Sequence, residues 1–374
     1  MTDADLSAIE VRHHEVVAAI RATRPVAWVA ALGGWLVCTR DLAVAVMRDA
    51  HTFTVDDPRF STAQVVGESM LSLDGAEHLR HRTPFAEPLR PAEATARYGA
   101  AITELADDLV AQLRPAGRAE LRRELAGPLA VQVSAMVLGL EHHHTASLLA
   151  VYDRIVAAVN DVSNGAPVSS DGRAAFDELA GELRAARSVP GTLVHEVARS
   201  LAADEVVSNA AVFLFGGIET SEGMTANALH HVLSDSDLWA ALRREPSFAD
   251  VAVEESLRLE PAAARVDRYA TRDVDLGGAS IRSGDLVIVS LAGANRDPAV
   301  FDAPDRFDLF RPNARSHVAF AHGPHACIGA QLARLQTRAA IQAVAAQLPM
   351  VRLADVGGTT GAIFRKPAHL RVVW

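Results

Sequence analysis

Cysteine is nearly absent from this chain of 374 residues, which contains only Cys38 and Cys327. Two cysteines give no disulfide framework, and this usage is typical of a protein in a reducing cytoplasm. Cys38 stands in the apolar, strand-like run Trp-Leu-Val-Cys-Thr. We therefore expect a cytoplasmic protein in which Cys38 is a core residue.

Long apolar runs and an excess of positive charge are also missing. No apolar run is long enough to span a bilayer, and no basic segment followed by an apolar one stands at the start of the sequence. The 36 basic and 46 acidic residues give a net charge of −10, which argues against nucleic acid and anionic lipid as partners. We expect neither nucleic acid nor membrane binding.

The sequence has no Pro/Ser/Gly-rich linker, no low-complexity tract and no internal repeat. We therefore expect a single domain over residues 1–374. It also has no P-loop, and no GxGxxG followed by an acidic residue, so we expect no nucleotide or flavin domain.

Amphipathic helical patterns dominate the sequence, so the expected fold class is mainly α with a minor β-sheet part. The expected helices are Asp5–Arg21, Ala100–Leu113, Ala119–Leu138, Ala146–Val159, Arg173–Arg187, Asp204–Leu233, Leu238–Arg243, Phe248–Leu257 and Ala330–Ala346. The expected strands are Trp35–Thr39, Tyr269–Leu276, Ser280–Ile281, Leu286–Ser290 and Leu370–Trp374.

The most informative segment is residues 320–329, which read Phe-Ala-His-Gly-Pro-His-Ala-Cys-Ile-Gly. Gly323 and Gly329 let the backbone bend close around the Cys327 sulfur. The helix expected from Ala330 would present its N-terminus to the thiolate, which favours negative charge there. A thiolate in this setting, with His325 two residues away, is a good axial ligand for haem iron.

This segment resembles the haem-binding loop of the cytochrome P450 superfamily, whose pattern is Phe-Gly-x-Gly-x-His-x-Cys-x-Gly. Ala321 replaces the first glycine of the pattern. The resemblance implies the cytochrome P450 fold, haem b as cofactor and Cys327 as the iron ligand. The membrane-bound branch of the family carries an anchor, so the resemblance is to the soluble, bacterial-type branch.

A second motif, Glu255-Ser256-Leu257-Arg258, places a carboxylate and a guanidinium three residues apart on one helix face. Surface helices carry many such pairs, so the motif alone is weak. By resemblance to the family, Glu255 and Arg258 form a buried structural network with Arg311.

Gly216 and Gly217 interrupt the expected long helix, at a cost of about 1 kcal/mol each relative to alanine. Close packing against a crossing helix would explain either glycine alone. The family reading is that a glycine-rich kink makes room for dioxygen, while Glu219 and Thr220 deliver protons and are the catalytic residues. This pair favours O2-dependent oxygenation over a peroxide-driven reaction.

The resemblance also implies residues that bind the haem and the substrate. The haem propionates would be held by His78, Arg82, Arg268 and His325, and the loop residues Phe320, Gly323 and Gly329 complete the cofactor-binding set. The substrate-binding residues expected by position are Phe213, Gly216, Gly217, Ala264 and Ile363. The walls are mostly small and apolar, which suggests a hydrophobic substrate.

The remaining histidines are interpreted as solvated or structural. Glu141-His142-His143-His144 resembles a metal-binding tract but has no second cluster at ligand spacing. The adjacent pairs His13-His14 and His230-His231 cannot both face one site on a helix.

We therefore expect a haem-thiolate monooxygenase that inserts one atom of O2 into an apolar small molecule, in natural-product tailoring. Electrons would come from a separate ferredoxin and reductase, because no flavin domain is encoded. A basic dock for that partner would comprise Arg80, Arg90, Arg315, Arg334 and Arg338. Oxidative coupling or desaturation, a peroxide-driven variant and a non-catalytic haem protein remain as alternatives.

Overall fold

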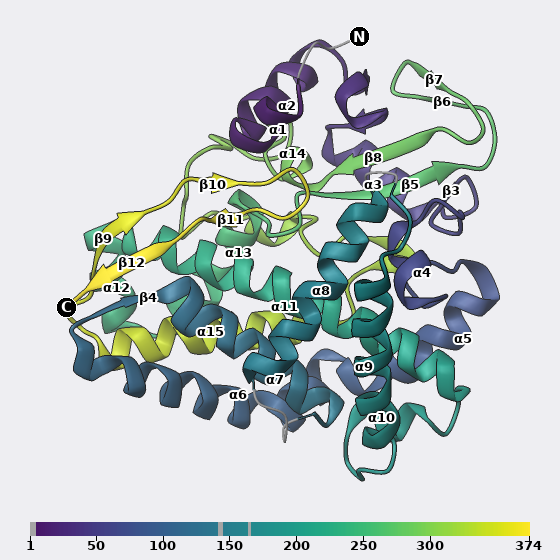
Figure 1. The fold of residues 1–374 in the computed structure, drawn as a ribbon. Coiled ribbons are helices and arrows are strands. Elements are labelled where there is room, and N and C mark those ends of the chain that lie inside the picture. Colours follow the sequence, from purple (N-terminus) through teal and green to yellow (C-terminus); the bar gives the residue numbers. More distant parts are fainter. Residues whose placement is uncertain (1–4, 141–144, 164–165) are drawn as a thin grey trace. The chain divides into compact units, whose positions relative to one another are not determined.

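The computed structural model describes residues 5–140, 145–163 and 166–374. The chain divides into two compact units: unit 1 comprises Met1–Thr54, Ile102–Gly127 and Thr220–Trp374, and unit 2 comprises Val55–Ala101 and Pro128–Glu219. Two helices labelled in Figure 1, α6 (Pro91–Leu113) and α11 (Ala203–Leu233), run through both units. The expectation of a single domain over residues 1–374 stays a prediction.

Unit 1 contains a five-stranded sheet in the order β1-β2-β8-β5-β3. Its strands are β1 (Val26–Val29), β2 (Gly34–Val37), β3 (Phe53–Thr54), β5 (Arg265–Ala270) and β8 (Leu286–Ser290). β2 and β8 are parallel, and the other neighbours are antiparallel. Both sheet faces are apolar: Val287 and Val289 face one buried cluster and Ile288 faces another. The alternation along β8 therefore fixes the register of the sheet.

Unit 1 also contains further helices and smaller sheets. The helices are α1 (Leu6–Val11), α2 (His13–Thr23), α3 (Arg40–Arg48), α12 (Ser236–Arg244), α13 (Phe248–Leu259), α14 (Leu291–Ala294) and α15 (Ala330–Gln347). The smaller sheets are β4 (Arg118–Glu120) with β12 (Leu370–Val373) and β9 (Arg352–Val356), β6 (Val274–Leu276) with β7 (Ala279–Ile281), and β10 (Thr359–Thr360) with β11 (Lys366–Pro367).

Unit 2 is helical over its described residues. Besides its parts of α6 and α11, it contains α4 (Ser61–Val66), α5 (Gly75–Ala86), α7 (Gly127–Leu138), α8 (Thr145–Ser163), α9 (Ser170–Ala186) and α10 (Leu193–Val197). The helix α7 starts at the last residue of unit 1 and is apolar on most of its surface, with eight buried residues. A helix of this kind belongs in a protein core.

The expected fold class, mainly α with minor sheets, is confirmed, but several element boundaries were wrong, among them the start of α6, which lies at Pro91 and not at Ala100. The helix expected over Asp5–Arg21 is broken at Arg12, whose φ of −109° and ψ of 38° are not helical. The helix expected from Ala119 instead begins as strand β4, because residues 118–120 pair with the C-terminal strand β12. The strand expected over Tyr269–Leu276 is two strands, since residues 271–273 form the turn between β5 and β6.

In the part of the chain that the structure describes, no helix is both long and apolar enough to cross a bilayer. Cys38 is fully buried in the sheet cluster of unit 1, as expected. Burial raises the pKa of its thiol to about 12, with Arg21 opposing the shift, so this cysteine stays a neutral core residue.

Candidate active site

The loop that carries Cys327 is closed by backbone hydrogen bonds within unit 1. The Cys327 amide donates to the Phe320 carbonyl oxygen at 2.8 Å, and the Ala326 amide donates to the Gly323 carbonyl oxygen at 3.1 Å. A 3-10 turn over Gly323–His325 precedes the cysteine, and α15 begins three residues after it. The thiol is exposed and stands just before the positive end of an 18-residue helix, which favours a thiolate.

Two residues of this loop have left-handed backbone conformations, and only one of them is glycine. Gly323 has a φ of +73°, and a Cβ at this position would collide with the Met47 carbonyl oxygen at the end of α3. Ala321 has a φ of +57°, where an alanine is strained by about 1–2 kcal/mol. Ala321 occupies the place of the first glycine in the family pattern, so the departure noted in the sequence carries a conformational cost.

A buried acid lies beside the start of the cysteine loop, and sequence reasoning missed it. Glu254 accepts hydrogen bonds from Arg334 Nε at 2.6 Å and from His317 Nε2 at 3.1 Å. The Arg334 guanidinium lies 4.6 Å from the centre of the Phe320 ring. Burial alone would raise the pKa of Glu254, but the bonds from His317 and Arg334 outweigh it and lower the pKa to about 2. The pair Glu254-Glu255 in one buried helical turn was the available signal.

The network inferred from the second motif is compact and buried. Arg258 makes two bonds of 2.8 Å to the two carboxylate oxygens of Glu255, and Arg311 Nε lies 3.0 Å from Oε1 of the same group. The exposed fractions of Glu255 and Arg258 are both 0%. The guanidinium groups also donate to the backbone carbonyls of Pro304, Arg306 and Asp302. The network therefore fixes the irregular segment over residues 302–311 to α13.

The four residues expected to hold propionates lie in both units. In unit 1, Arg268 of β5 is buried and its Nη1 donates to the Asp267 carbonyl oxygen at 2.7 Å, while His325 lies in the turn before Cys327. In unit 2, His78 and Arg82 lie one turn apart on α5. A buried guanidinium suits a carboxylate partner, so Arg268 has the chemistry that a propionate would require.

The two glycines of α11 differ in their surroundings within unit 2. A Cβ on Gly217 would lie 3.0 Å from Oγ of Ser134 on α7, whereas a Cβ on Gly216 would meet no atom within 4 Å. Close helix packing therefore explains Gly217 but not Gly216, which is exposed. Glu219 and Thr220 follow on the same helix, at the boundary of the two units. α11 has helical structure throughout Ala203–Leu233.

Two further residues expected to contact substrate are bonded to each other in unit 1. The Ala264 amide donates to the Ile363 carbonyl oxygen at 2.8 Å. Ile363 is 37% exposed and Ala264 is buried. The third residue, Phe213, is half-buried on the unit 2 part of α11.

The Cys327 loop and Arg268, both in unit 1, have the chemistry to hold a haem. The donor set offers one sulfur ligand, and a Cβ on Gly329 would come within 3.9 Å of the Cys327 sulfur, so the small residue leaves the thiol approachable. Arg268 adds a buried cation for an acidic edge. Among the described residues, no group of three or more His, Cys, Asp or Glu side chains could hold a separate metal ion.

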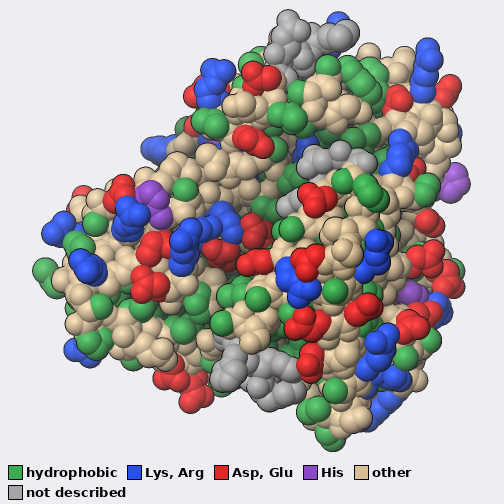
Figure 2. Space-filling model, viewed as in Figure 1, with side chains coloured by type: hydrophobic (Ala, Val, Ile, Leu, Met, Phe, Trp, Pro, Cys, Tyr) green, Lys and Arg blue, Asp and Glu red, His purple; other side chains and the backbone are tan. Residues whose placement is uncertain are grey.

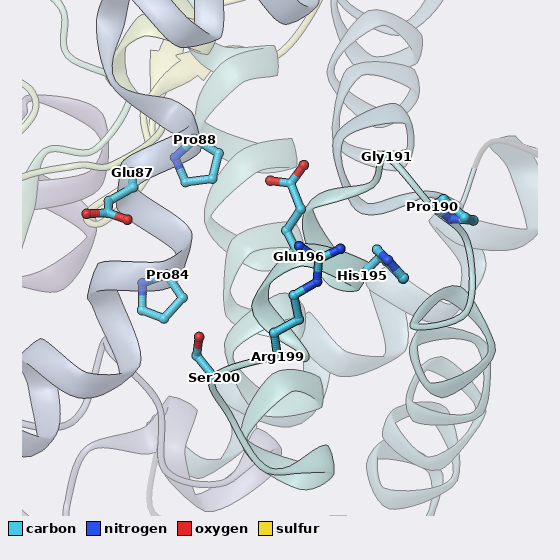
Figure 3. A pocket seen from close by; sticks show the side chains of 9 residues that line it. All are labelled: Pro84, Glu87, Pro88, Pro190, Gly191, His195, Glu196, Arg199 and Ser200. Carbon is cyan, nitrogen blue, oxygen red and sulfur yellow. The ribbon is translucent and has the colours of Figure 1, made fainter.

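A cavity of about 390 Å³ lies elsewhere in unit 2 and is not this site. Figure 3 shows Pro84 and Pro88 on one wall and His195, Glu196 and Arg199 of the α10 region on the other. Glu196 is already paired with Arg97 at 2.8 Å. None of the expected site residues lines this cavity, so it gives no support to the haem site.

The arginines expected to form a basic dock are largely neutralised. Ion pairs join Arg80 to Glu77 and Glu205, Arg90 to Glu87, Arg334 to Glu254, and Arg338 to Asp250. Figure 2 shows acidic and basic side chains interspersed on the face that it presents. Arg315 is the fifth member of the expected set.

The paired histidines are structural rather than solvated. His13 is buried and His231 is half-buried. Removal from water, followed by neighbouring charged groups, lowers the pKa of each to about 3. His14 binds Glu260 at 2.7 Å. The Glu141–His144 tract lies outside the described residues. Sequence reasoning missed Glu260 and its partners, although the acid stands next to Pro261 at the end of α13.

Comparison with known proteins identifies relatives that match most of the chain. A sequence model of the family Cytochrome P450 matches residues 192–345. Nocardicin C N-oxygenase of Nocardia uniformis subsp. tsuyamanensis is 32% identical over 364 residues, covering 91% of this chain and 89% of the relative. Cytochrome P450 monooxygenase PikC of Streptomyces venezuelae is 33% identical, covering 85% and 79%. The structure of P450BioI in complex with hexadec-9Z-enoic acid ligated acyl carrier protein matches with a TM-score of 0.87 and 26% identity, covering 97% of both chains.

Proposed function

Because this chain belongs to the cytochrome P450 family, we propose that it is a monooxygenase that inserts one atom of O2 into an apolar small molecule, with Cys327 as the thiolate ligand of haem b. The observation that carries this proposal is the Cys327 loop. It presents an exposed thiol at the start of α15, and its backbone is closed around the cysteine by the bond to Phe320.

The bound haem would supply the binding and reductive activation of O2. Cys327 would hold the cofactor from the N-terminal end of α15, where the helix dipole favours the thiolate. In unit 1, Arg268 and His325 would bind propionate oxygens. By resemblance to the family, the same role is assigned to His78 and Arg82 on α5 of unit 2. Phe320, Gly323 and Gly329 would shape the loop around the sulfur.

Proton delivery is assigned to Glu219 and Thr220 on α11. The Thr220 hydroxyl can hold a proton at Oγ1 in an apolar pocket, and the Glu219 carboxylate can exchange protons with solvent and pass them inward. Gly216 supports this assignment, because the helix face beside it is open and no packing contact requires a glycine there. The other residues assigned to substrate binding are Phe213 and Gly217 in unit 2 and Ala264 and Ile363 in unit 1.

The substrate class is inferred from the small, apolar pocket walls and from the relatives. Nocardicin C N-oxygenase and PikC suggest a role in natural-product tailoring. The complex of P450BioI with an acyl carrier protein makes a carrier-bound substrate a second form to test. Electrons would come from a ferredoxin and its reductase, and two cysteines that form no disulfide suit the cytoplasm.

An optical titration of the purified ferric protein tests the substrate class. The ligands would be a panel of terpenoids, polyketides, cyclic peptides and fatty acids, each free and, for the acids, attached to acyl carrier protein. A shift from low-spin to high-spin iron would identify the class of compound that binds beside the haem. Product formation that requires a ferredoxin, a reductase and NAD(P)H supports the monooxygenase. Turnover with peroxide and none with the reductase system would overturn the O2-dependent assignment.

A further inference from the structure

In unit 1, the segment that carries Ala264 and the segment that carries Ile363 are joined by backbone hydrogen bonds, and we call the joined segments the pocket wall. Besides the bond from Ala264 to Ile363, the Arg365 amide donates to the Ala262 carbonyl oxygen at 2.8 Å, and Ala263 forms an antiparallel bridge with Phe364. The segments Ala262–Ala264 and Ala362–Phe364 therefore share their backbone hydrogen bonds. A displacement of one segment must displace the other.

Arg365 anchors this wall, because its side chain is bonded on every side. Its Nε lies 2.7 Å from Oε1 of Glu260, and its Nη atoms donate to the carbonyl oxygens of Gly361, Glu10 and Thr359 at 3.0–3.3 Å. Arg365 is 3% exposed and Glu260 is 7% exposed. A buried ion pair of this kind has little freedom once formed, and removal of either partner strands a charge.

Glu260 is bound from three other directions. His14 on α2 lies 2.7 Å from its Oε2, and Arg296 Nη2 lies 3.8 Å from the same oxygen. Asn227 on α11 donates its Nδ2 hydrogens to the carbonyl oxygens of both Glu260 and Arg365, each at 3.1 Å. Burial alone would raise the pKa of Glu260, but His14, Arg365 and Arg296 hold it well below its usual range, so the group is an anion.

We propose that Glu260 is a positioning residue for the substrate pocket, and that His14 links the N-terminal helix α2 to the pocket wall through it. This inference rests on the proposed function, because it takes Ala264 and Ile363 to contact substrate. The anion fixes Arg365, Arg365 fixes the adjacent segment Ala362–Phe364, and Asn227 ties both to the helix that carries Thr220. Glu260 thus determines specificity without touching the substrate.

His14 is the position at which this inference is tested, because it can be changed without stranding the buried pair. After His14→Ala, Arg365 still neutralises Glu260. His14→Gln restores a donor that can reach Glu260 Oε2. His369→Ala is the matched control: His369 Nε2 binds Asp355 at 2.8 Å, compared with 2.7 Å for His14 and Glu260, and the two histidine side chains are 29% and 20% exposed. Glu260→Gln is the stronger variant and is used if it folds.

The first measurement is amide hydrogen exchange of the full chain. It reports how well the hydrogen bonds of the pocket wall are protected, independently of catalysis. We expect the amides of Ala264 and Arg365 to exchange at least about tenfold faster in His14→Ala than in the wild type, a factor that corresponds to about 1.4 kcal/mol. His14→Gln and His369→Ala should exchange as the wild type does. Unchanged exchange in His14→Ala would overturn the link to α2.

The second measurement is the dissociation constant and product ratio for the ligand that gives the largest spin-state shift. We expect His14→Ala to raise the dissociation constant of that ligand at least about threefold, or to change the ratio of products. The thiolate spectrum of the reduced CO complex should be retained. Faster exchange with unchanged affinity and products would overturn the positioning role. A wild-type protein without the thiolate spectrum would instead overturn the proposed function, and that result is seen before any variant is compared.

Discussion

Arg311 Nε lies 3.0 Å from Oε1 of Glu255 although the two residues are 56 positions apart in the sequence. Both side chains are at most 4% exposed. The same carboxylate also binds Arg258 with two bonds, so one anion holds two buried guanidinium groups.

The variant Glu255→Gln should lower the free energy of unfolding by about 3–5 kcal/mol, because two buried cations lose their anion. The control is Arg371→Ala, whose partner Asp355 is half-exposed, and which should cost less than about 1 kcal/mol. Chemical denaturation measures both. Equal small losses in the two variants would show that the buried network contributes little.

The two glycines of α11 predict opposite effects of the same substitution. Gly216→Ala should stabilise the protein by about 0.5–1 kcal/mol through helix propensity, because its Cβ meets open space. In Gly217→Ala the new Cβ would lie 3.0 Å from Oγ of Ser134. Ser134 must therefore move, and this cost offsets the gain in helix propensity. Thermal unfolding compares the two. Because Gly216 is proposed to face the substrate, only Gly216→Ala should also lower the affinity for ligands in the optical titration. Two variants with equal stability and equal affinity would contradict this interpretation.

The strained alanine of the cysteine loop gives a prediction in the stabilising direction. Ala321→Gly relieves the strain of an alanine in the left-handed region, which stabilises the folded state by about 1–2 kcal/mol. The greater freedom of glycine in the unfolded chain offsets about half of that. A net gain of about 0.5–1 kcal/mol is expected. Gly323→Ala is the opposite case, because its Cβ collides with the Met47 carbonyl, and a loss above about 2 kcal/mol is expected. Urea unfolding measures both, and a destabilised Ala321→Gly would refute the strain.

Acid should destabilise the protein well before its carboxylates titrate. Burial lowers the pKa of His13 and of His231 from 6.5 to about 3, so the unfolded chain binds protons that the folded chain does not. The contribution of the two neutral histidines to the free energy of unfolding is fully present above pH 6.5, and it is lost as the pH falls toward 3. Each histidine contributes a slope of about 1.4 kcal/mol per pH unit.

Urea unfolding at about pH 7.5 and about pH 5 measures this slope. Glu254 does not contribute there, because its lowered pKa of about 2 costs stability only below its ordinary 4.5. His231→Phe should flatten the slope by the share of one histidine. A free energy of unfolding that stays constant between the two pH values would contradict the account.

Local patterns predicted the fold class and the long helices well. The run before Leu233 and the run after Gly329 have helical periodicity, and they are α11 and α15. Short strands were harder, because pairing partners decide them: residues 119 and 120 have a helical pattern but belong to the strand β4, which pairs with β12 near the end of the chain. Sequence spacing could not reveal that Arg12 breaks the first helix.

The candidate site was predictable where its residues stand close together in the sequence. Glu255 and Arg258 share one helix face, and Gly323, His325 and Cys327 share one turn. Contacts between distant segments carry no such signal. Arg365 meets Glu260 across 105 residues and His14 meets it across 246, and only tertiary structure brings these three side chains together.

The reduced CO complex of the purified protein tests the central claim, which is that Cys327 is the thiolate ligand of a haem. The account predicts the thiolate-type absorption band in the wild type, its loss in Cys327→Ser with the fold retained, and its presence in Cys38→Ser. A thiolate band that survives Cys327→Ser, or a wild type that never shows one, would contradict it.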